Sequence, residues 1–293
     1  MTGGLAPCDA AGVGQPFIGS EAVASGQLVK SALRTQYKNL LRDVYVGRNI
    51  ELTPEVLGAA AWLWSRRRGV VAGLTASAMH GAQWVESSAP LEILHTNRNP
   101  LPGIKVHSDR IEDDEIIWLD GIPVTTLART TLDLGCWYPT DDAVARIDAL
   151  LAATDLKPAD VVALAQRYPG RRGIRNAGIA IDLADGGSQS PKETWLRLLL
   201  IRAGFPRPKT QIPVCNDFGE PFAYLDMGWE DLKVSAEYDG EHHRTDRRRH
   251  SWDIRRQEKV EGRGWINIRV VAGERPADII QRVAAARARR ALR

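Results

Sequence analysis

Three carboxylate side chains stand at the ends of two neighbouring apolar runs in the last third of the sequence. Asp226 follows the run 222–225, and Glu237 and Asp239 follow the run 232–236. The short polar turn between the runs predicts a β-hairpin, which would bring the carboxylates together. Because like charges repel, a partner must offset them. The usual partner is a hard divalent cation such as Mg²⁺ or Mn²⁺, held through oxygen atoms.

Such a site could hydrolyse a phosphodiester bond, because one or two bound ions activate a water molecule and stabilise charge on the phosphate. Asp226 and Glu237 are the predicted direct metal ligands, and Asp239 is predicted to bind the metal or to orient a water. His243, four residues after Asp239, is the candidate for general acid/base work or for a phosphate contact. The alternative interpretation is that the acidic pattern on this strand is only a solubilising face.

A fourth carboxylate, Glu193, lies near the start of a predicted helix. Ser190 is the expected N-cap, Pro191 occupies the first helical position, and Gly204 ends the helix. In that setting Glu193 completes a capping box. In the second interpretation it is a catalytic residue that lies in the outer shell of the metal or completes the site.

The order of these features along the chain is more specific than any one of them. The successive pieces are Glu193, Asp226, the string 237–243, the D-x-x-R motif 253–256, and a Gly-Trp pair ahead of a strand that carries Arg269. This set resembles the PD-(D/E)XK nuclease core, and more closely its very-short-patch-repair-like branch, over about residues 188–293. The lysine of the wider superfamily is replaced here by Asp239, a change that this branch shares.

The resemblance implies a restriction-endonuclease-like α/β/α domain over residues 188–293. It also implies an endonuclease that depends on Mg²⁺ or Mn²⁺ and acts on DNA. The catalytic residues that it implies are Glu193, Asp226, Glu237, Asp239 and His243.

Positive charge is concentrated in the same region. From residue 241 onward there are fifteen Lys and Arg against seven Asp and Glu, although the formal net charge of the whole chain is only +3. A basic region beside a carboxylate cluster favours a polyanion such as nucleic acid, and a solvated helix face is the alternative. The arginines predicted to contact nucleic acid here are Arg244, Arg247, Arg248, Arg249, Arg256 and Arg269.

Residues 16–50 predict a winged helix-turn-helix, because two short helical patterns are followed by a short hairpin. Lys30 and Arg34 on the second helix and Arg42 in the hairpin are predicted to contact DNA. A winged helix used only for protein contacts is the alternative. This stretch resembles the N-terminal domain of the abortive-infection type IV antitoxin family.

Residues 51–185 are predicted to form a connector that is first mixed α/β and then helical, which continues the antitoxin-like resemblance. The connector carries no evident chemistry, and His80, His95 and His107 are assigned structural roles. Residues 1–15, rich in Gly, Ala and Pro, are predicted to be disordered. The expected fold class is therefore a multidomain protein of the α+β or α/β class.

Composition narrows the remaining choices. A length of 293 residues suits two or three domains. The three cysteines are widely separated and form no C-x-x-C pair, which argues against a zinc site and fits a reducing compartment. The sequence shows neither a signal peptide nor an apolar run long enough to span a membrane, so we expect a cytoplasmic protein without a membrane partner.

Two functional hypotheses follow from the sequence. The first is a metal-dependent DNA endonuclease that an N-terminal winged helix directs to its substrate. The alternative is a non-catalytic DNA-binding transcriptional regulator, the antitoxin of a type IV toxin–antitoxin system, with a cognate toxin protein as a further partner.

Overall fold

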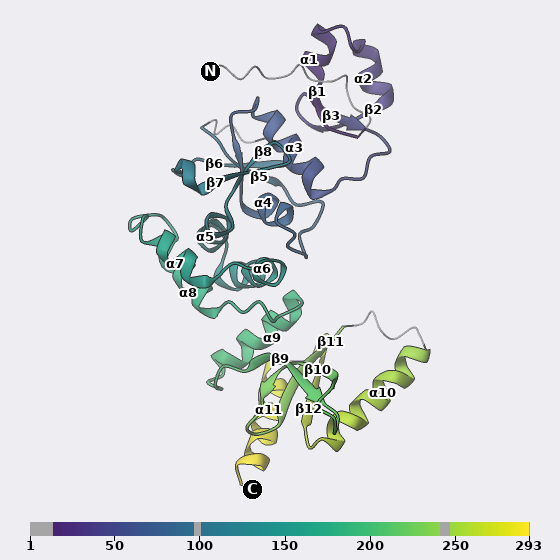
Figure 1. Cartoon of the computed structure of the whole chain (residues 1–293), viewed down its shortest axis with the longest axis vertical. Coiled ribbons are helices and arrows are strands. Elements are labelled where there is room, and N and C mark those ends of the chain that lie inside the picture. The colour runs from purple at the N-terminus through teal and green to yellow at the C-terminus, as the bar shows by residue number, and fades with distance from the viewer. Residues whose placement is uncertain (1–13, 97–100, 241–246, 293) are drawn as a thin grey trace. The chain divides into compact units, whose positions relative to one another are not determined.

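The structure is a computed structural model, and the residues that it describes are 14–96, 101–240 and 247–292. For residues 247–254 it describes the backbone alone. The described chain is a mixed α/β protein with three separate sheets (Figure 1). Most of the tail predicted at residues 1–15 lies outside the described residues, as do His243 and Arg244.

The chain divides into two compact units. The first consists of Met1–Tyr138 and Ala153–Gly178, and the second of Pro139–Ala152 and Ile179–Arg293. The second unit contains the whole stretch predicted as the catalytic domain, together with a segment that precedes it in the chain. Among the described residues, no helix is both long and apolar enough to cross a membrane.

The first elements of the first unit form a small sheet with two helices. They are β1 (Phe17–Ile18), α1 (Gly19–Ala24), α2 (Lys30–Gln36), β2 (Tyr37–Leu41) and β3 (Val44–Gly47). The sheet order is β1-β3-β2, with both pairings antiparallel. The Phe17 ring packs edge-on against Tyr37, with 4.9 Å between ring centroids, and stacks on Tyr45. The two helices and the hairpin that the sequence predicted here are confirmed, whereas β1 was not predicted.

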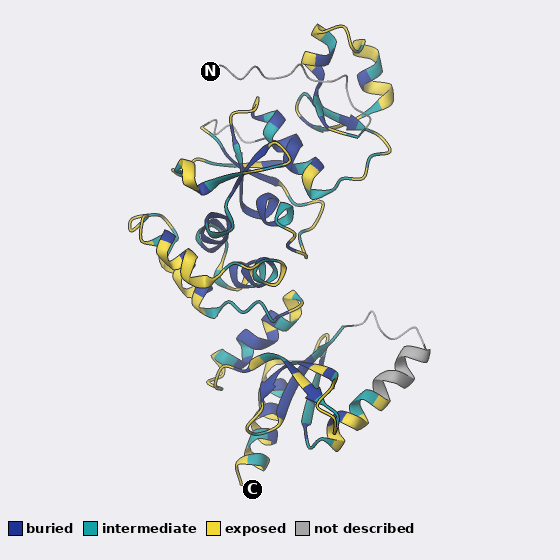
Figure 2. Ribbon diagram, in the orientation of Figure 1, coloured by how far each residue is buried: buried dark blue, intermediate teal, exposed yellow. Residues whose placement is uncertain are grey.

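The remainder of the first unit is built around a five-stranded sheet of order β6-β5-β4-β8-β7. Its elements are α3 (Pro54–Trp64), β4 (Val70–Val71), α4 (Gly73–Met79), β5 (Leu91–Leu94), β6 (Ile104–His107), η1 (Asp113–Glu115), β7 (Ile116–Leu119), β8 (Ile122–Thr125), α5 (Leu127–Trp137) and α7 (Pro158–Ala165). Thr53 and Thr126 cap α3 and α5 through their side-chain oxygens. Val71, Ile93 and Val124 are fully buried in the middle strands, and the central part of this sheet is dark blue in Figure 2.

The second unit contains a four-stranded sheet of order β12-β11-β10-β9. Its elements are α6 (Thr140–Ala153), the second half of α8 (Ile174–Leu183), α9 (Pro191–Arg202), β9 (Lys209–Cys215), β10 (Pro221–Trp229), β11 (Val234–Asp239), α10 (Arg247–Gly262), β12 (Ile266–Val271) and α11 (Pro276–Ala291). Strands β9, β10 and β11 are antiparallel, and β12 runs parallel to β11. Parallel neighbours need a crossover connection, which α10 supplies.

Strand β11 shows how helices cover both faces of this sheet. Val234 and Ala236 are fully buried in a core that includes Leu196 of α9 and Ile279 of α11. Because side chains alternate along a strand, Glu237 points to the opposite face, where it contacts an arginine of α10. The sheet therefore lies between α9 and α11 on one side and α10 on the other.

A buried ion pair fixes α9 against α6. Arg197 Nη2 lies 2.6 Å from Asp148 Oδ2, and both side chains are buried. Asp148 also accepts hydrogen bonds from the Thr194 hydroxyl and the Asp185 N–H. Burial raises the pKa of Asp148, although Arg197 and these donors act in the opposite direction. The second unit therefore includes α6, because Asp148 of α6 balances the charge of Arg197 on α9, the helix that carries Glu193.

Candidate active site

The hairpin of β10 and β11 brings Asp226 and Glu237 onto neighbouring positions. Met227 pairs with Ala236 in the antiparallel register, so the adjacent residues Asp226 and Glu237 also lie across from each other. Asp226 Oδ2 accepts a 3.0 Å hydrogen bond from the Tyr238 N–H. The hairpin predicted from the sequence is confirmed, and it places these two carboxylates side by side.

Asp226 is the most perturbed carboxyl of this group. Burial, followed by the charges of Glu193 and Glu237, raises its pKa from an ordinary 3.8 to about 7. The Tyr238 N–H and Arg256 act in the opposite direction and only partly compensate. Because nearby like charges disfavour the ionised form, Glu193 of α9 and Glu237 of β11 add to the effect of burial on Asp226 of β10. A carboxyl that titrates near neutral pH beside two others is typical of functional sites.

The structure shows Glu193 in the capping role, and its catalytic role stays a prediction. Ser190 Oγ accepts a 3.2 Å hydrogen bond from the Glu193 N–H and donates to Glu193 Oε1 at 2.9 Å. The Gln189 N–H donates to the other carboxylate oxygen at 2.8 Å. The predicted capping box is confirmed, with Gln189 in place of Ser190 as the backbone donor. The Glu193 carboxylate is nevertheless near enough to Asp226 to raise its pKa.

Glu237 is held by two side chains on separate elements. Its relative exposure is 8%. Arg256 Nη2 on α10 lies 2.9 Å from Glu237 Oε1, and Asn267 Nδ2 on β12 donates to Oε2 at 2.6 Å. Ser235 Oγ donates to Asn267 Oδ1 at 3.0 Å, which fixes the orientation of the amide. Contacts from α10 and from β12 therefore hold the Glu237 carboxylate in one orientation.

Arg269 lies beside the carboxylates, as predicted for the strand that follows the Gly-Trp pair. The parallel register pairs it with Glu237. Its Nη2 lies 3.0 Å from Asp239 Oδ2, and its Nη1 donates to Gln257 Oε1 at 3.4 Å. The charge of Asp239 is therefore offset by an arginine of the neighbouring strand.

Arg256 and Arg269 change the charge balance on which the metal prediction was based. Among the described residues, no three His, Cys, Asp or Glu side chains are grouped as a metal ion would require. The donor chemistry fits a hard cation best at Asp226 and Glu237, because both offer oxygen atoms and the charge of Glu237 adds to the effects of burial and of Glu193 that raise the pKa of Asp226. Glu237 and Asp239 are each already paired with an arginine, so a cation bound by either carboxylate would compete with Arg256 or Arg269. His243 lies outside the described residues.

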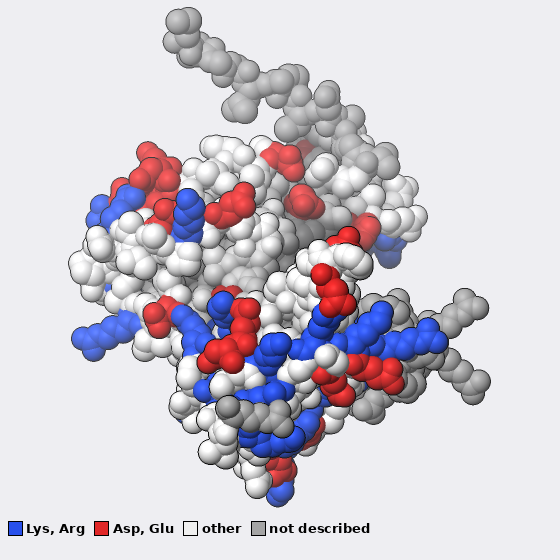
Figure 3. All heavy atoms as spheres, turned by 60° about the horizontal axis from the view of Figure 1, so that its bottom comes forward, with Lys and Arg blue, Asp and Glu red and all other residues white. Residues whose placement is uncertain are grey.

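The residues predicted to contact nucleic acid occupy different settings. Arg256 and Arg269 are paired with carboxylates of the site. Residues 247–249 begin α10, where the backbone alone is described. Figure 3 shows Lys and Arg interspersed with Asp and Glu on the displayed face, without an unbroken basic surface. Of the residues predicted to contact nucleic acid, Lys30, Arg34 and Arg42 lie in the first unit, and all three are exposed.

Sequence reasoning did not identify the role of Asn267, nor the left-handed backbone of Gln211 on the strand beside Asp226. Asn267, which holds Glu237, lies two residues before Arg269 on β12. Because side chains two positions apart on a strand share one face, the predicted position of Arg269 could have indicated Asn267. Gln211 lies on β9 between residues that pair with both neighbours of Asp226, and it has a φ of 48°. Nothing in the sequence marks Gln211, because a positive φ is expected of Gly or Asn and not of Gln.

Comparison with known proteins gives two relatives of the whole chain. Two proteins from two strains of Mycobacterium tuberculosis are each 27% identical to it over 253 residues, which cover 84% of this chain and 92% of theirs. Their names state no activity. No protein-family model and no solved structure matches the chain.

Proposed function

We propose that the second unit is a metal-dependent nuclease that hydrolyses phosphodiester bonds in DNA. The observation that carries this proposal is the setting of Asp226, whose pKa is raised to about 7 by burial and then by the charges of Glu193 and Glu237. A carboxylate group of this kind is favourable only when it holds a proton or a cation.

The order of the elements also supports the proposal. The motif pieces that resemble the PD-(D/E)XK core occupy α9, β10, β11, α10 and β12 in that order. The helices lie on both faces of the sheet that joins β10, β11 and β12. An α/β/α arrangement with the acidic residues on adjacent strands is what the resemblance implies.

Asp226 and Glu237 would hold the Mg²⁺ or Mn²⁺ ion, which supplies an activated water and stabilises charge on the phosphate. The chain itself contributes orientation and countercharge. Arg256 and Asn267 fix the Glu237 carboxylate, and the Tyr238 N–H fixes Asp226. At pH values above about 7 Asp226 loses its proton and becomes able to accept a cation.

The first unit would bring DNA to this site. Two short helices followed by a hairpin are the elements on which the winged helix-turn-helix prediction rests, and β1 adds a third strand beside β3. Lys30 and Arg34 are exposed on α2, the helix expected to enter the major groove. Action on chromosomal or foreign DNA would place the protein in the cytoplasm.

Plasmid cleavage tests the proposal. Purified protein should convert supercoiled plasmid to nicked or linear forms with Mg²⁺ or Mn²⁺, and EDTA should stop the reaction. Asp226→Asn and Glu237→Gln should each lower the rate by at least about 100-fold, as expected when a metal ligand is lost. The matched control is Asp217→Asn, an exposed carboxylate of the same unit that pairs with Arg263. Wild-type protein that leaves DNA and RNA uncut under these conditions would refute the nuclease.

A second function is favoured by one observation. Glu237 and Asp239 are both paired with arginines, an arrangement that is electrostatically complete without an ion. It suits a non-catalytic DNA-binding regulator of the antitoxin type, with a cognate toxin as its protein partner. Sequence-specific DNA binding that EDTA leaves unchanged, without any cleavage, would favour this function over the nuclease.

A further inference from the structure

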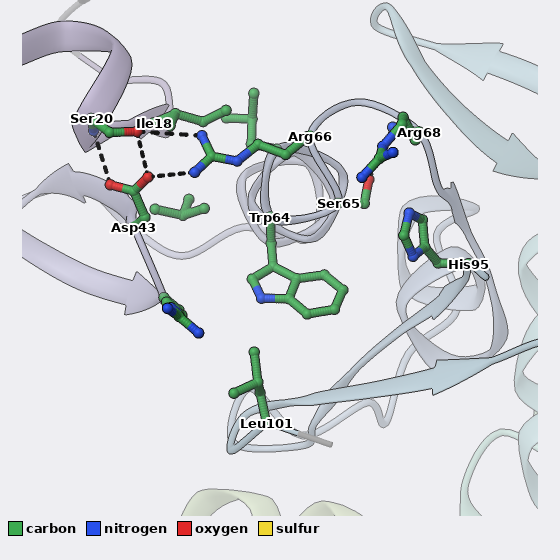
Figure 4. Close-up of a pocket in the computed structure, with 12 residues that line it drawn as sticks. Ile18, Ser20, Asp43, Trp64, Ser65, Arg66, Arg68, His95 and Leu101 are labelled. Carbon is green, nitrogen blue, oxygen red and sulfur yellow. Dashed lines mark hydrogen bonds and ion pairs between the residues drawn. The ribbon is translucent and has the colours of Figure 1, made fainter. Parts of the chain in front are cut away.

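A cavity in the first unit lies apart from the carboxylate site. Its volume is about 500 Å³, within the range of small-molecule sites. The walls come from β1, the β2–β3 turn, the end of α3 and His95 just after β5, with Leu101 on one side (Figure 4). Four of its residues could recognise a ligand, namely Arg42, Trp64, Arg68 and His95.

One wall of this cavity is fixed by a hydrogen-bonded group. Asp43 Oδ2 accepts a 2.6 Å hydrogen bond from the Ser20 hydroxyl and lies 2.7 Å from Arg66 Nη2. Asp43 Oδ1 accepts from the Ser20 N–H at 2.9 Å. Figure 4 shows these three side chains joined above the cavity. The charge of Arg66 is therefore already balanced by Asp43, and this wall does not need a ligand to hold it.

Three residues at or next to the cavity wall have a left-handed backbone conformation. Asp43, Arg66 and Arg67 have φ values of 64°, 57° and 63°. Each left-handed residue other than Gly costs about 1 kcal/mol, and a helix end usually has Gly there. Arg67 offsets this cost with two bonds to Glu21 of α1, at 2.9 and 2.8 Å. The end of α3 is thus held rigidly against α1 and the β2–β3 turn, which pre-forms the cavity.

Two cations in the cavity remain available. Arg42 and Arg68 are exposed, and neither forms an ion pair with a residue that the structure describes. Trp64 is half-buried, and its ring lies between Arg66 and Leu101 in the view of Figure 4. The His95 ring meets it edge-on, with 6.3 Å between centroids and 67° between planes. The cavity therefore combines an aromatic surface with two guanidinium groups that form no ion pair within the described part of the chain.

We propose that this cavity binds a nucleoside phosphate. Arg42 and Arg68 hold the phosphate, because guanidinium groups match phosphate oxygens in charge and geometry. The base lies against Trp64, because every nucleobase offers a flat face to stack on an aromatic ring. The same chemistry is presented by a free nucleotide and by a nucleotide of a nucleic-acid strand. This site does not depend on the nuclease proposal, since it uses none of the carboxylates of the second unit.

Isothermal titration calorimetry with the full chain tests this inference. The probes are AMP, GMP, CMP and UMP, a 5′-phosphorylated trinucleotide, adenosine and inorganic phosphate. At least one nucleotide probe should bind with 1:1 stoichiometry, and adenosine and phosphate should each bind at least about tenfold more weakly. Arg42→Ala and Arg68→Ala should each weaken binding about tenfold or more, as expected for a lost hydrogen bond to a charged group.

The control is Arg110→Ala, which removes an arginine of the same unit that is 81% exposed and leaves the cavity intact. Binding of mononucleotides that depends on Arg42 and Arg68 assigns the site to free nucleotides. Binding of the trinucleotide alone, weakened by Arg68→Ala and not by Lys30→Ala, assigns it to a strand. No binding of any nucleotide probe would overturn the proposal, and so would equal binding by wild type and both cavity variants.

Discussion

Asp226→Asn provides a direct test of the charge arrangement in the second unit. The pKa of Asp226 rises from an ordinary 3.8 to about 7 in the folded protein. The folded state therefore holds this proton more tightly than the unfolded state does. The resulting stabilisation is complete below the unfolded pKa and is lost as the pH rises through about 7. At about 1.4 kcal/mol for each factor of ten in proton affinity, it amounts to about 4 kcal/mol.

Asparagine cannot ionise, so the variant does not lose stability in this way. Between pH 5 and pH 8, wild type should lose roughly 2.5 kcal/mol relative to Asp226→Asn, because part of the contribution is already gone at pH 5. Urea-dependent hydrogen exchange of the β10 and β11 amides measures the free energy of unfolding of the second unit at both pH values, with EDTA present. Asp231→Asn, in the exposed turn between these strands, is the control.

The expected result is a pH-dependent difference for Asp226→Asn and a constant difference for Asp231→Asn. A change of less than about 0.5 kcal/mol for Asp226→Asn between the two pH values would refute the reasoning, because surface substitutions alone fall in that range. It would mean that Asp226 ionises freely, and that Glu193 and Glu237 are too distant or too well screened to affect it.

Three further predictions concern the framework and the charges. Arg197→Met should destabilise the second unit by about 3–5 kcal/mol in chemical denaturation, because it leaves the buried carboxylate of Asp148 without its ion-pair partner. The control Arg202→Ala breaks a surface pair and should lower the free energy of unfolding by under about 1 kcal/mol. Glu193→Gln should lower the pKa of Asp226, measured by carboxyl NMR titration, because it removes a neighbouring negative charge; an unchanged pKa would contradict the proposed proximity. Replacing the arginines at 247–249 by Ala should weaken DNA binding to all sequences about equally and flatten its dependence on salt in filter-binding assays; an unchanged salt slope would assign them to a solvated helix face.

Much of the second unit could be predicted from local patterns. The capping signals place the start of α9, and alternation across a polar turn predicts β10 and β11. The strand that carries Arg269 was predicted from the Gly-Trp turn, and the structure shows it as β12, with Arg269 paired with Glu237. These features are readable because each depends on residues that are close in the chain.

The missing pieces depend on distant partners or on unusual local sequences. Strand β9 contains Pro213, and proline is unfavourable in a central strand because it cannot donate a hydrogen bond. In the structure β9 is an edge strand, where proline is tolerated. The pair of Asp148 with Arg197 joins residues that are 49 positions apart. Nothing local distinguishes a carboxylate with a buried partner from one on a solvated helix. The arginines that pair with Glu237 and Asp239 were assigned to phosphate contacts for the same reason.

Calorimetric titration of the full chain with Mn²⁺ at pH 7 tests the proposed cation site most directly. Wild type should bind the ion with release of about half a proton, seen as a dependence of the enthalpy on the buffer, because Asp226 has a pKa of about 7, is half protonated at this pH, and binds only when ionised. Asp226→Asn should lose both the binding and the proton release, whereas Asp217→Asn should keep them. No binding by wild type, or equal binding by Asp226→Asn, would contradict the assignment of Asp226 and Glu237 as the metal ligands of a nuclease.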